Sequence, residues 1–221
     1  SSLGYQKQEG LVENSSMERY SGRFNVQQKI GKRGEARADL MFSQVNQEMN
    51  EERTSSINPF YCMAVATPPS YPVFNEDGSY ANTYPGTNVN PLRDMRTDYN
   101  RVRMTRIFGT AHGAVEIIKG LKLKEVLSYD YSIQKDARYF NALSGAGPKS
   151  GSDAQSSKGF IEYGKLISST SLNYVRTFAN KHHLDVLAAY EAESFQTDKA
   201  AGEKSKMPSD QLFEPDNAAV I

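Results

Sequence analysis

The chain of 221 residues contains one cysteine, Cys62, and no tryptophan. A single cysteine cannot form an internal disulfide, and it excludes the cysteine-rich sites that hold zinc or iron–sulfur clusters. Neither charge is in excess, because 26 basic residues balance 26 acidic ones. A nucleic-acid binder without sequence preference relies on a net positive field, so nucleic acid is not expected as a partner. No metal or other cofactor is expected either.

Long hydrophobic runs are also missing. The longest apolar stretches, such as Cys62 to Ala66 and Val186 to Tyr190, fall far short of the roughly 20 residues that a transmembrane helix needs. The hydrophobic fraction is 38% and the mean hydropathy is −0.62, both low for a globular domain. Either the core is thin, or each element carries apolar residues on one side only. These observations do not exclude a membrane β-barrel, because apolar and polar residues alternate along its strands.

The sequence does show alternation with a period of two, the pattern of strands with one apolar face. In residues 19–30 the even positions include Tyr20, Phe24 and Val26, while every odd position is polar. The pattern continues through residues 35–46 beyond a glycine-containing turn. This combination predicts an antiparallel hairpin.

Two more hairpins are predicted in the same way. One joins residues 103–118 to residues 121–133, where Glu125 and Val126 interrupt the alternation. The other joins a strand ending near Phe178 to residues 182–195. With a short first strand around Leu3 and Tyr5, the sequence predicts seven strands and an all-β, antiparallel fold. Residues 158–166 have mixed alternation and no predicted orientation.

The predicted connections alternate between short and long. Short turns lie at residues 31–34, 119–120 and 179–181, and long connections lie at residues 9–16, 48–100, 137–157 and beyond 197. This alternation is typical of a transmembrane β-barrel with short periplasmic turns and long extracellular loops, whereas a soluble sandwich gives no reason for it. Aromatic residues near the ends of the apolar faces fit the girdles of such a barrel. They are Tyr5, Tyr20, Phe42, Tyr131, Tyr174 and Phe178.

Several segments resemble one family of outer-membrane proteins. They are Leu3-Gly4-Tyr5 with Gln8-Glu9-Gly10, residues 19–25, Asn58-Pro59-Phe60, residues 68–74 with Asp77-Gly78-Ser79-Tyr80, Asn90-Pro91-Leu92, residues 119–122 and residues 178–188. In this order they are similar to the early barrel strands of SusC/RagA-type TonB-linked outer-membrane proteins, the nutrient importers of Bacteroidetes. The resemblance covers nearly the whole chain, although no single motif is diagnostic.

The resemblance implies an outer-membrane location and a role in TonB-dependent import of oligosaccharides or other large nutrients. It implies a barrel of about 22 strands, of which this chain would supply about seven as a partial barrel domain. The signal peptide, carboxypeptidase-like domain, TonB box and plug of the family would lie outside it. Implied partners are a SusD-like lipoprotein, the TonB complex acting through the absent plug, an oligosaccharide or peptide substrate, and outer-membrane lipid.

The connection at residues 48–100 is rich in proline and tyrosine, as functional loops of this length often are. Its tyrosines could stack on sugar rings or contact a partner, or they could simply fold the loop on itself. The candidates are Tyr61, Tyr71, Tyr80, Tyr84 and Tyr99.

Charged residues on the polar face are candidates for the lining of a lumen. They are Arg23, Arg37, Asp39, Arg106, His112, Glu116, Asp185 and Glu191, together with Asp130 and Glu193. Most are expected to solvate a channel or to pair with a plug. No nucleophile has a base at a recognisable spacing, so the chain is not expected to be an enzyme.

Two alternatives stay open from the sequence. A soluble all-β carbohydrate-binding or adhesin module would show the same alternation, with its apolar face against a protein core. A passive porin would share the barrel wall and differ by lacking the plug.

Overall fold

A computed structural model describes residues 1–50, 58–81, 90–144, 154–207 and 214–215. In these ranges seven strands form one antiparallel sheet in the order in which they occur in the chain. The strands are β1 (Ser2–Glu9), β2 (Ser16–Ile30), β3 (Gly34–Met49), β4 (Tyr99–Ile118), β5 (Leu121–Phe140), β6 (Gln155–Phe178) and β7 (His182–Ser205). The predicted all-β antiparallel fold of seven strands is confirmed.

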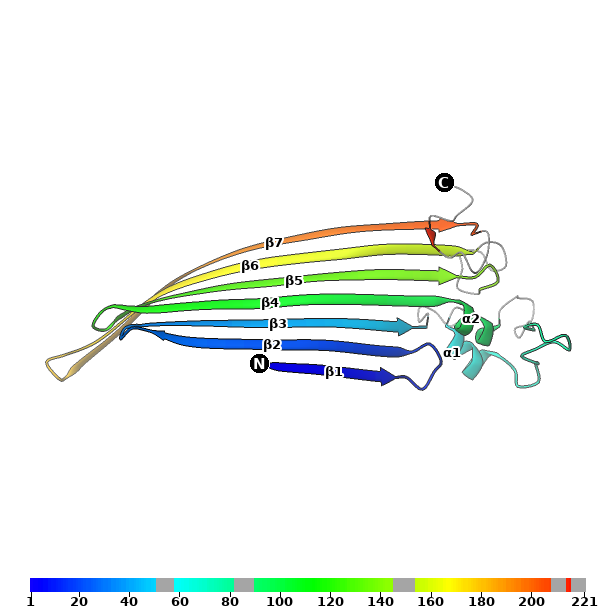
Figure 1. The fold of residues 1–221 in the computed structure, drawn as a ribbon, viewed down its shortest axis with the longest axis horizontal. Coiled ribbons are helices and arrows are strands. Elements are labelled where there is room, and N and C mark those ends of the chain that lie inside the picture. The colour runs from blue at the N-terminus through cyan, green and yellow to red at the C-terminus, as the bar shows by residue number, and fades with distance from the viewer. Residues whose placement is uncertain (51–57, 82–89, 145–153, 208–213, 216–221) are drawn as a thin grey trace.

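The sheet has two different ends (Figure 1). Tight turns join β2 to β3, β4 to β5 and β6 to β7 at one end, and the long connections lie at the other. The tight turns need backbone with positive φ, and glycine supplies it at Gly31 (62°) and Gly120 (88°). At Gly120 a Cβ would also lie 2.3 Å from the Val175 carbonyl oxygen, so a side chain there is excluded.

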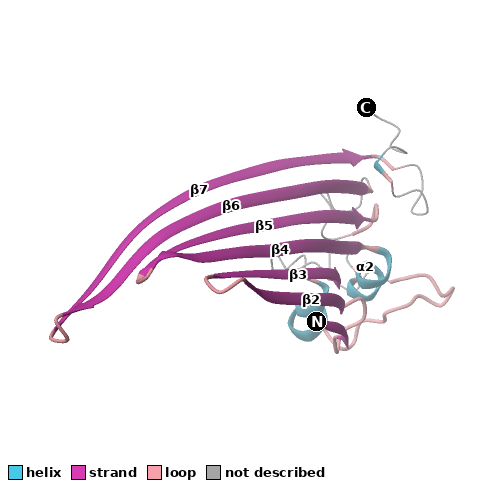
Figure 2. Cartoon of the chain, turned by 60° about the vertical axis from the view of Figure 1, so that its left-hand side comes forward, coloured by secondary structure: helices cyan, strands magenta, loops and turns pink. Residues whose placement is uncertain are grey.

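Several predicted strand boundaries are wrong. Strand β7 runs on to Ser205, well beyond its predicted end, and β5 continues to Phe140, a few residues into a region predicted as a connection. Strand β6 begins at Gln155, close to the predicted end of that connection. Residues 158–166, which had no predicted orientation, pair regularly with β5 and β7. Unbroken pairing on both sides holds their direction where their own alternation is weak. Figure 2 shows β6 and β7 curving and reaching beyond the other turns.

Cross-strand register defines two faces of the sheet. Phe24, Leu40, Gly109, Tyr129 and Leu166 pair in sequence across β2 to β6 and belong to what we call the apolar face. The residues between them along each strand point to the opposite side, the polar face. The aromatic residues predicted as girdles share the apolar face, where the rings of Tyr5 and Tyr20 lie 5.2 Å apart.

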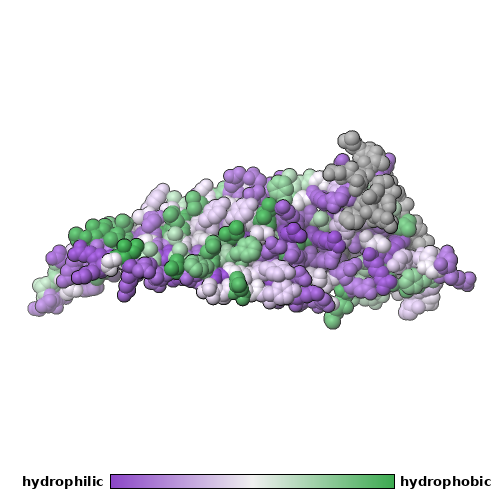
Figure 3. Space-filling view, viewed as in Figure 1, coloured by the Kyte–Doolittle hydropathy of each residue, from purple (hydrophilic) through white to green (hydrophobic). Residues whose placement is uncertain are grey.

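The apolar face is uncovered. Phe24 is 54% exposed, and Leu40, Tyr129 and Leu166 are each almost half exposed. Buried apolar side chains in the described ranges lie mainly at the long-connection end, where Tyr139 packs with Ala154 and Met207. In Figure 3 hydrophobic side chains gather over the middle of the sheet and toward the tight turns, whereas hydrophilic ones dominate the end near the helices. Within the part of the chain that the structure describes, the sheet therefore has no protein core along most of its length.

The described part of the connection between β3 and β4 contains three short helical segments, and none of them was predicted. They are α1 (Pro59–Tyr61), the π-helical turn η1 (Cys62–Ala66) and α2 (Pro91–Thr97). Both α1 and α2 begin with an asparagine cap followed by proline: Asn58 accepts from the amide of Tyr61, and Asn90 accepts from that of Arg93. Among the described residues, no helix combines the length and apolar character needed to cross a membrane.

Strands β1 and β7 are the two edges of the sheet. Within the described ranges neither pairs with a further strand, and β7 is exposed along nearly its whole length. Its exposed side chains include large apolar ones such as Leu187, Tyr190 and Phe195. Unpaired edges of this length are what a segment of a larger closed sheet would leave.

Candidate functional site

The ten residues predicted to line a lumen all lie on the polar face, Asp130 and Glu193 among them. Register places Arg37 opposite His112, and His112 lies in one cross-strand row with Val126, Ser169 and Glu191. The remaining candidates, Arg23, Asp39, Arg106, Glu116 and Asp185, have the same orientation by alternation along their strands. This geometry agrees with a shared surface, while the role of that surface stays a prediction.

Asp39 accepts hydrogen bonds from two residues on this face and has His112 nearby. Arg37 donates to both of its carboxylate oxygens, from Nε at 2.7 Å and from Nη2 at 3.0 Å. Asn25 donates a further hydrogen bond, and the ring Nε2 of His112 lies 4.0 Å away. A bidentate arginine–carboxylate pair holds both side chains in a fixed geometry. The group therefore presents an ordered polar patch.

A second bidentate pair joins neighbouring strands. Arg106 on β4 donates to Asp130 on β5 from Nε at 2.8 Å and from Nη2 at 2.6 Å. Lys165 pairs with Glu193 at 2.8 Å on β6 and β7. In both pairs, opposite charges on neighbouring strands compensate each other.

Three other candidates have local roles. Glu116 accepts a hydrogen bond from the amide of Gly120 at 3.0 Å, so it closes the β4–β5 turn. Asp185 accepts from Asn173 at 2.9 Å, and Glu191 accepts from Ser169 at 2.7 Å. These contacts orient the carboxylates without neutralising them.

The loop tyrosines divide into two groups. Tyr61 and Tyr71 are exposed, at 41% and 39%, and Tyr80 is half-buried against Phe74, with ring centroids 5.2 Å apart. Tyr99 instead stacks on the buried Tyr139 at 5.9 Å and lies under the Arg101 guanidinium at 4.7 Å. Tyr99 is thus placed to stabilise the fold, while Tyr61 and Tyr71 are accessible. Tyr84 lies outside the described residues.

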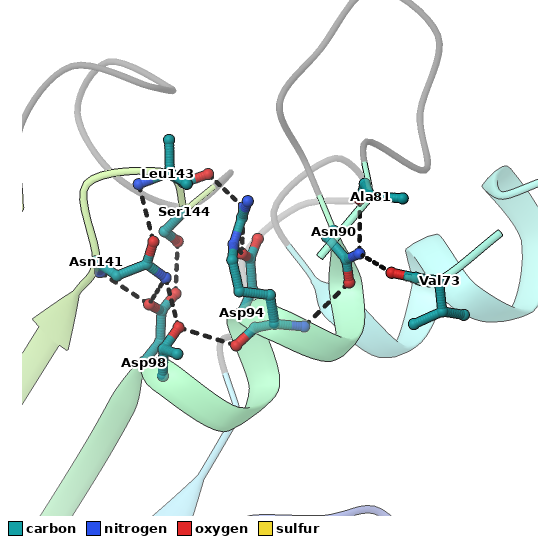
Figure 4. A network of polar contacts seen from close by, with 10 residues as sticks. Val73, Ala81, Asn90, Asp94, Asp98, Asn141, Leu143 and Ser144 are labelled. Atoms are coloured by element: carbon teal, nitrogen blue, oxygen red, sulfur yellow. Dashed lines mark hydrogen bonds and ion pairs between the residues drawn. The ribbon is translucent and has the colours of Figure 1, made fainter. Parts of the chain in front are cut away.

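Helix α2 forms hydrogen bonds with residues of two long connections (Figure 4). The buried Arg93 pairs with the buried Asp94 at 2.7 Å and also donates to the Leu143 carbonyl in the β5–β6 connection. Asn90 donates to the carbonyls of Val73 at 2.9 Å and Ala81 at 2.7 Å. One short helix therefore contacts its own connection and the following one.

Asp98, just after α2, receives a second set of hydrogen bonds from the β5–β6 connection. The amide and the side chain of Asn141 donate to its Oδ1 at 2.9 and 2.7 Å, and the Ser144 hydroxyl donates to its Oδ2. Burial raises the pKa of Asp98 to about 7, although the Asn141 and Ser144 hydrogen bonds oppose that shift. The contacts around α2 and Asp98 form what we call the loop hub.

The loop hub also reaches the β1–β2 connection. Arg96 donates to Glu13 from Nε at 3.0 Å, and Asn14 donates to the Met95 carbonyl. The hydrogen bond and charge of Arg96 lower the pKa of Glu13, and Glu13 and Tyr80 together raise that of Arg96. Three connections distant in sequence thus meet at one helix.

The sequence interpretation missed the residues of this hub. A signal was present, because Asn58-Pro59 and Asn90-Pro91 are both cap-and-proline pairs that favour helix starts. Which carboxylate is buried could not be read from spacing, since it depends on contacts between connections separated by more than 40 residues. Among the described residues, no group of three or more His, Cys, Asp or Glu is placed to hold a metal ion.

Glu125 is a charged residue on the apolar face near the β4–β5 turn. Its position confirms the predicted interruption of the apolar–polar alternation, because the β4–β5 and β5–β6 pairings run through it without a shift and keep it on the apolar face. Its carboxylate accepts hydrogen bonds from Ser168, at 2.8 Å, and from Thr170. The two hydroxyls on β6 supply the hydrogen bonds that this carboxylate needs, which the apolar side chains of Leu123 and Leu127 on β5 cannot supply.

The fold defines a segment of the wall of a large antiparallel β-barrel, with one apolar face and one polar face. Over 99% of the chain it matches solved structures of the RagAB peptide transporter, with a TM-score of 0.77 and 18% identity. The "closed-closed" state of the same importer matches with the same TM-score and 17% identity. The chain spans 25% of those solved chains.

Sequence comparison gives the same class. The chain is 25% identical over 146 residues to TonB-dependent receptor P26 of Formosa agariphila, a match that covers 65% of this chain and 14% of that protein. No family model matches the chain. The predicted resemblance to SusC/RagA-type TonB-linked outer-membrane proteins is confirmed by the receptor and transporter matches. The chain therefore represents a small part of the length of the proteins it resembles.

Proposed function

We propose that this chain is part of the barrel of an outer-membrane TonB-dependent importer, in which residues 1–221 form a section of the wall. One observation carries the proposal: an uncovered apolar face runs along a single sheet whose other face is polar and ion-paired. Such a sheet is stable where lipid covers the apolar face and a hydrated lumen meets the polar face. The tight turns would then lie in the periplasm and the loop hub outside the cell.

The proposed substrate is an oligosaccharide or a peptide. The similar RagAB structures are described as a peptide transporter, which favours the peptide alternative. The proposed partners are a SusD-like lipoprotein at the long connections and the TonB complex, which would act through parts outside this chain. The exposed Tyr61 and Tyr71 are the proposed contacts to substrate or lipoprotein, and Arg37, Asp39, Arg106 and His112 are proposed to line the path. No catalytic role is proposed.

Single-cysteine labelling of the full-length protein in cells tests the orientation of the wall. In a Cys62→Ala background, Leu127→Cys and Ser128→Cys place adjacent thiols on the apolar and polar faces. We expect a membrane-impermeant maleimide to label only Ser128→Cys, and a lipid-soluble reagent to label Leu127→Cys. Failure of the lipid-soluble reagent to label Leu127→Cys would support the soluble module instead, because its apolar face would pack against protein.

Transport needs its own test. Cells that depend on the full-length protein should accumulate substrate only while the inner membrane is energised and TonB is present. Uptake that continues without TonB would favour the passive porin. A protein recovered in the soluble periplasmic fraction would rule out both.

A further inference from the structure

A groove crosses the apolar face near the long-connection end. It has a volume of about 940 Å³ and passes over all seven strands. Its floor is a row of backbone that includes Val102, Asp136 and Gly159, and rows of side chains on either side form its walls. Small residues at Ala137, Ala200 and Gly202 leave the hollow open.

The walls of this groove concentrate positive charge on adjacent strands. Arg103 on β4 is the direct cross-strand neighbour of Lys135 on β5, so two like charges face each other on the same side of the sheet. Arg101 and Lys158 lie in the next row of the same face. Like charges directly opposite each other are destabilising in a sheet. An anion between them removes that cost.

Three carboxylates at the groove are paired with other cations. Glu48 pairs with Arg101 at 2.7 Å, Glu9 pairs with Lys7 at 2.9 Å, and Glu214 pairs with Lys158. Glu18 accepts from the Tyr20 hydroxyl, and Asp136, whose side chain lies on the polar face, accepts from Gln134. Glu162 and Asp198 share the apolar face one row beyond, toward the tight turns, and Asp198 accepts from Gln196.

Among the described residues, Arg103 and Lys135 are cations of this groove without a carboxylate partner. Arg103 donates to the neutral Asn46 at 3.1 Å, and in the described part of the chain Lys135 has neither an ion pair nor a hydrogen bond. Both side chains are exposed. Two cations side by side match the several acceptor oxygens of a phosphate group.

The position on the face identifies the source of that phosphate. Two rows from Arg103 and Lys135 in the direction of the tight turns, the same face carries Ile107 and Tyr131, where the apolar band begins. A lipid whose headgroup occupies the groove would lay its acyl chains along that band. Clusters of basic residues next to a membrane-spanning apolar surface attract anionic headgroups in this way.

We propose that Arg103 and Lys135 bind the anionic phosphate headgroup of a membrane lipid in this groove. The site rests on the proposed function, since it requires the apolar face to meet lipid. It is separate from the polar face and from the loop hub, so substrate import and lipid binding use different surfaces.

Native mass spectrometry of the detergent-purified full-length protein tests the site. The probes are phosphatidylglycerol and phosphatidylcholine with identical acyl chains, so that only the headgroup charge differs. We expect phosphatidylglycerol to bind preferentially. Each basic residue near a membrane surface contributes a factor of about five, so Arg103→Gln with Lys135→Gln should weaken phosphatidylglycerol binding about 25-fold.

Matched variants separate charge from fold. Lys135→Arg keeps the charge and should keep the preference, and Lys124→Gln, on the same strand but on the polar face, should change nothing. Resistance to SDS before heating checks that each variant forms the barrel. Unchanged phosphatidylglycerol binding in the folded double variant would overturn the site, as would full competition by inorganic phosphate alone, which would indicate free phosphate as the ligand.

The failure of this site and the failure of the proposed function are distinguishable. A full-length protein that fractionates as soluble removes the membrane assignment and the site with it. A protein that fractionates with the outer membrane but shows no headgroup preference removes the lipid site alone.

Discussion

The Ser168 hydroxyl donates a hydrogen bond of 2.8 Å to Oε1 of Glu125 across the β5–β6 boundary, and Thr170 donates to the other oxygen. The carboxylate lies on the apolar face, between Leu123 and Leu127 along β5 and opposite Gly113 on β4. A charged side chain there is costly unless hydrogen bonds satisfy it. The two β6 hydroxyls therefore act as a unit with Glu125.

Removing the two hydroxyls while keeping the carboxylate should destabilise the barrel. Ser168→Ala with Thr170→Val is expected to lower the free energy of unfolding by about 1–3 kcal/mol, because a partly buried acceptor loses its donors. Urea unfolding of the full-length protein in detergent measures the change. In a Glu125→Leu background the same pair of substitutions should have almost no effect. An equal loss in both backgrounds would show that the hydroxyls act independently of the carboxylate.

Glu125 also shows how far the sequence could predict this fold. Alternation located all seven strands and the tight turns, because each strand has two chemically different faces. It also marked Glu125 correctly as a break, since register keeps this charged residue on the apolar face, but it could not show what satisfies the charge. The satisfying hydroxyls are on another strand more than 40 residues away, and a periodic pattern contains no information about such partners.

The candidate sites were predictable to different degrees. Arg37, Asp39 and His112 were predicted to lie on one face, because side chains alternate between the two faces along a strand. The register agrees with that shared orientation. The burial of Asp98 and the bridge from Arg93 to Leu143 depend on how separate connections pack together. Residue type alone also could not separate Tyr99, which stacks on Tyr139, from the accessible Tyr71.

Loss of the Arg93 guanidinium should loosen the loop hub without affecting the sheet. Arg93→Met removes the cation beside the buried Asp94 and the hydrogen bond to Leu143. Removing one member of a buried ion pair costs about 3–5 kcal/mol. Hydrogen exchange of the full-length protein should therefore show faster exchange in α2 and residues 141–144, while the strand amides remain protected.

An exposed ion pair provides the control for that experiment. Lys122→Met removes a partner of Glu35 at 2.9 Å, where both side chains are about half exposed. Exposed pairs contribute about 1 kcal/mol or less, so little change is expected. If Arg93→Met leaves exchange in both segments unchanged, the hub is not held by this arginine.

Exposed loop tyrosines should affect recognition, and the packed one should affect stability. If Tyr71 contacts substrate or lipoprotein, Tyr71→Ala should weaken that binding by about tenfold or more, the usual effect of truncating an aromatic interface anchor. Tyr71→Phe should retain most of the affinity if ring contact dominates. Isothermal titration of the full-length protein with the candidate ligand measures both.

Tyr99→Ala should behave in the opposite way. Its ring stacks on Tyr139, and such pairs contribute about 0.5–1.5 kcal/mol beyond the area that they bury. We expect a lower urea midpoint and unchanged ligand affinity in the folded protein. A loss of affinity at Tyr99 with full stability would reverse the two assignments.

The loop hub should become more stable as the pH falls. Burial raises the pKa of Asp98 to about 7 in the folded protein, above its ordinary value of 3.8. The folded state therefore binds more protons than the opened state between about pH 4 and 7, so local stability declines as the pH rises through this window. Each unit of pKa difference corresponds to about 1.4 kcal/mol. Acidification from pH 8 to 5 should accordingly raise the free energy of local opening by a few kcal/mol.

Hydrogen exchange around α2 and residues 141–144, corrected for the intrinsic pH dependence of amide exchange, measures that change. Asp98→Asn keeps an acceptor for Asn141 and cannot ionise, so it should hold the hub in its protected state at every pH. The exposed Asp77 provides a control, because hydrogen bonds from Ser79 lower its pKa and remove it from this window. Asp77→Asn should leave the pH profile as in the unmodified chain. If the pH dependence of exchange persists in Asp98→Asn, the titrating group is not Asp98.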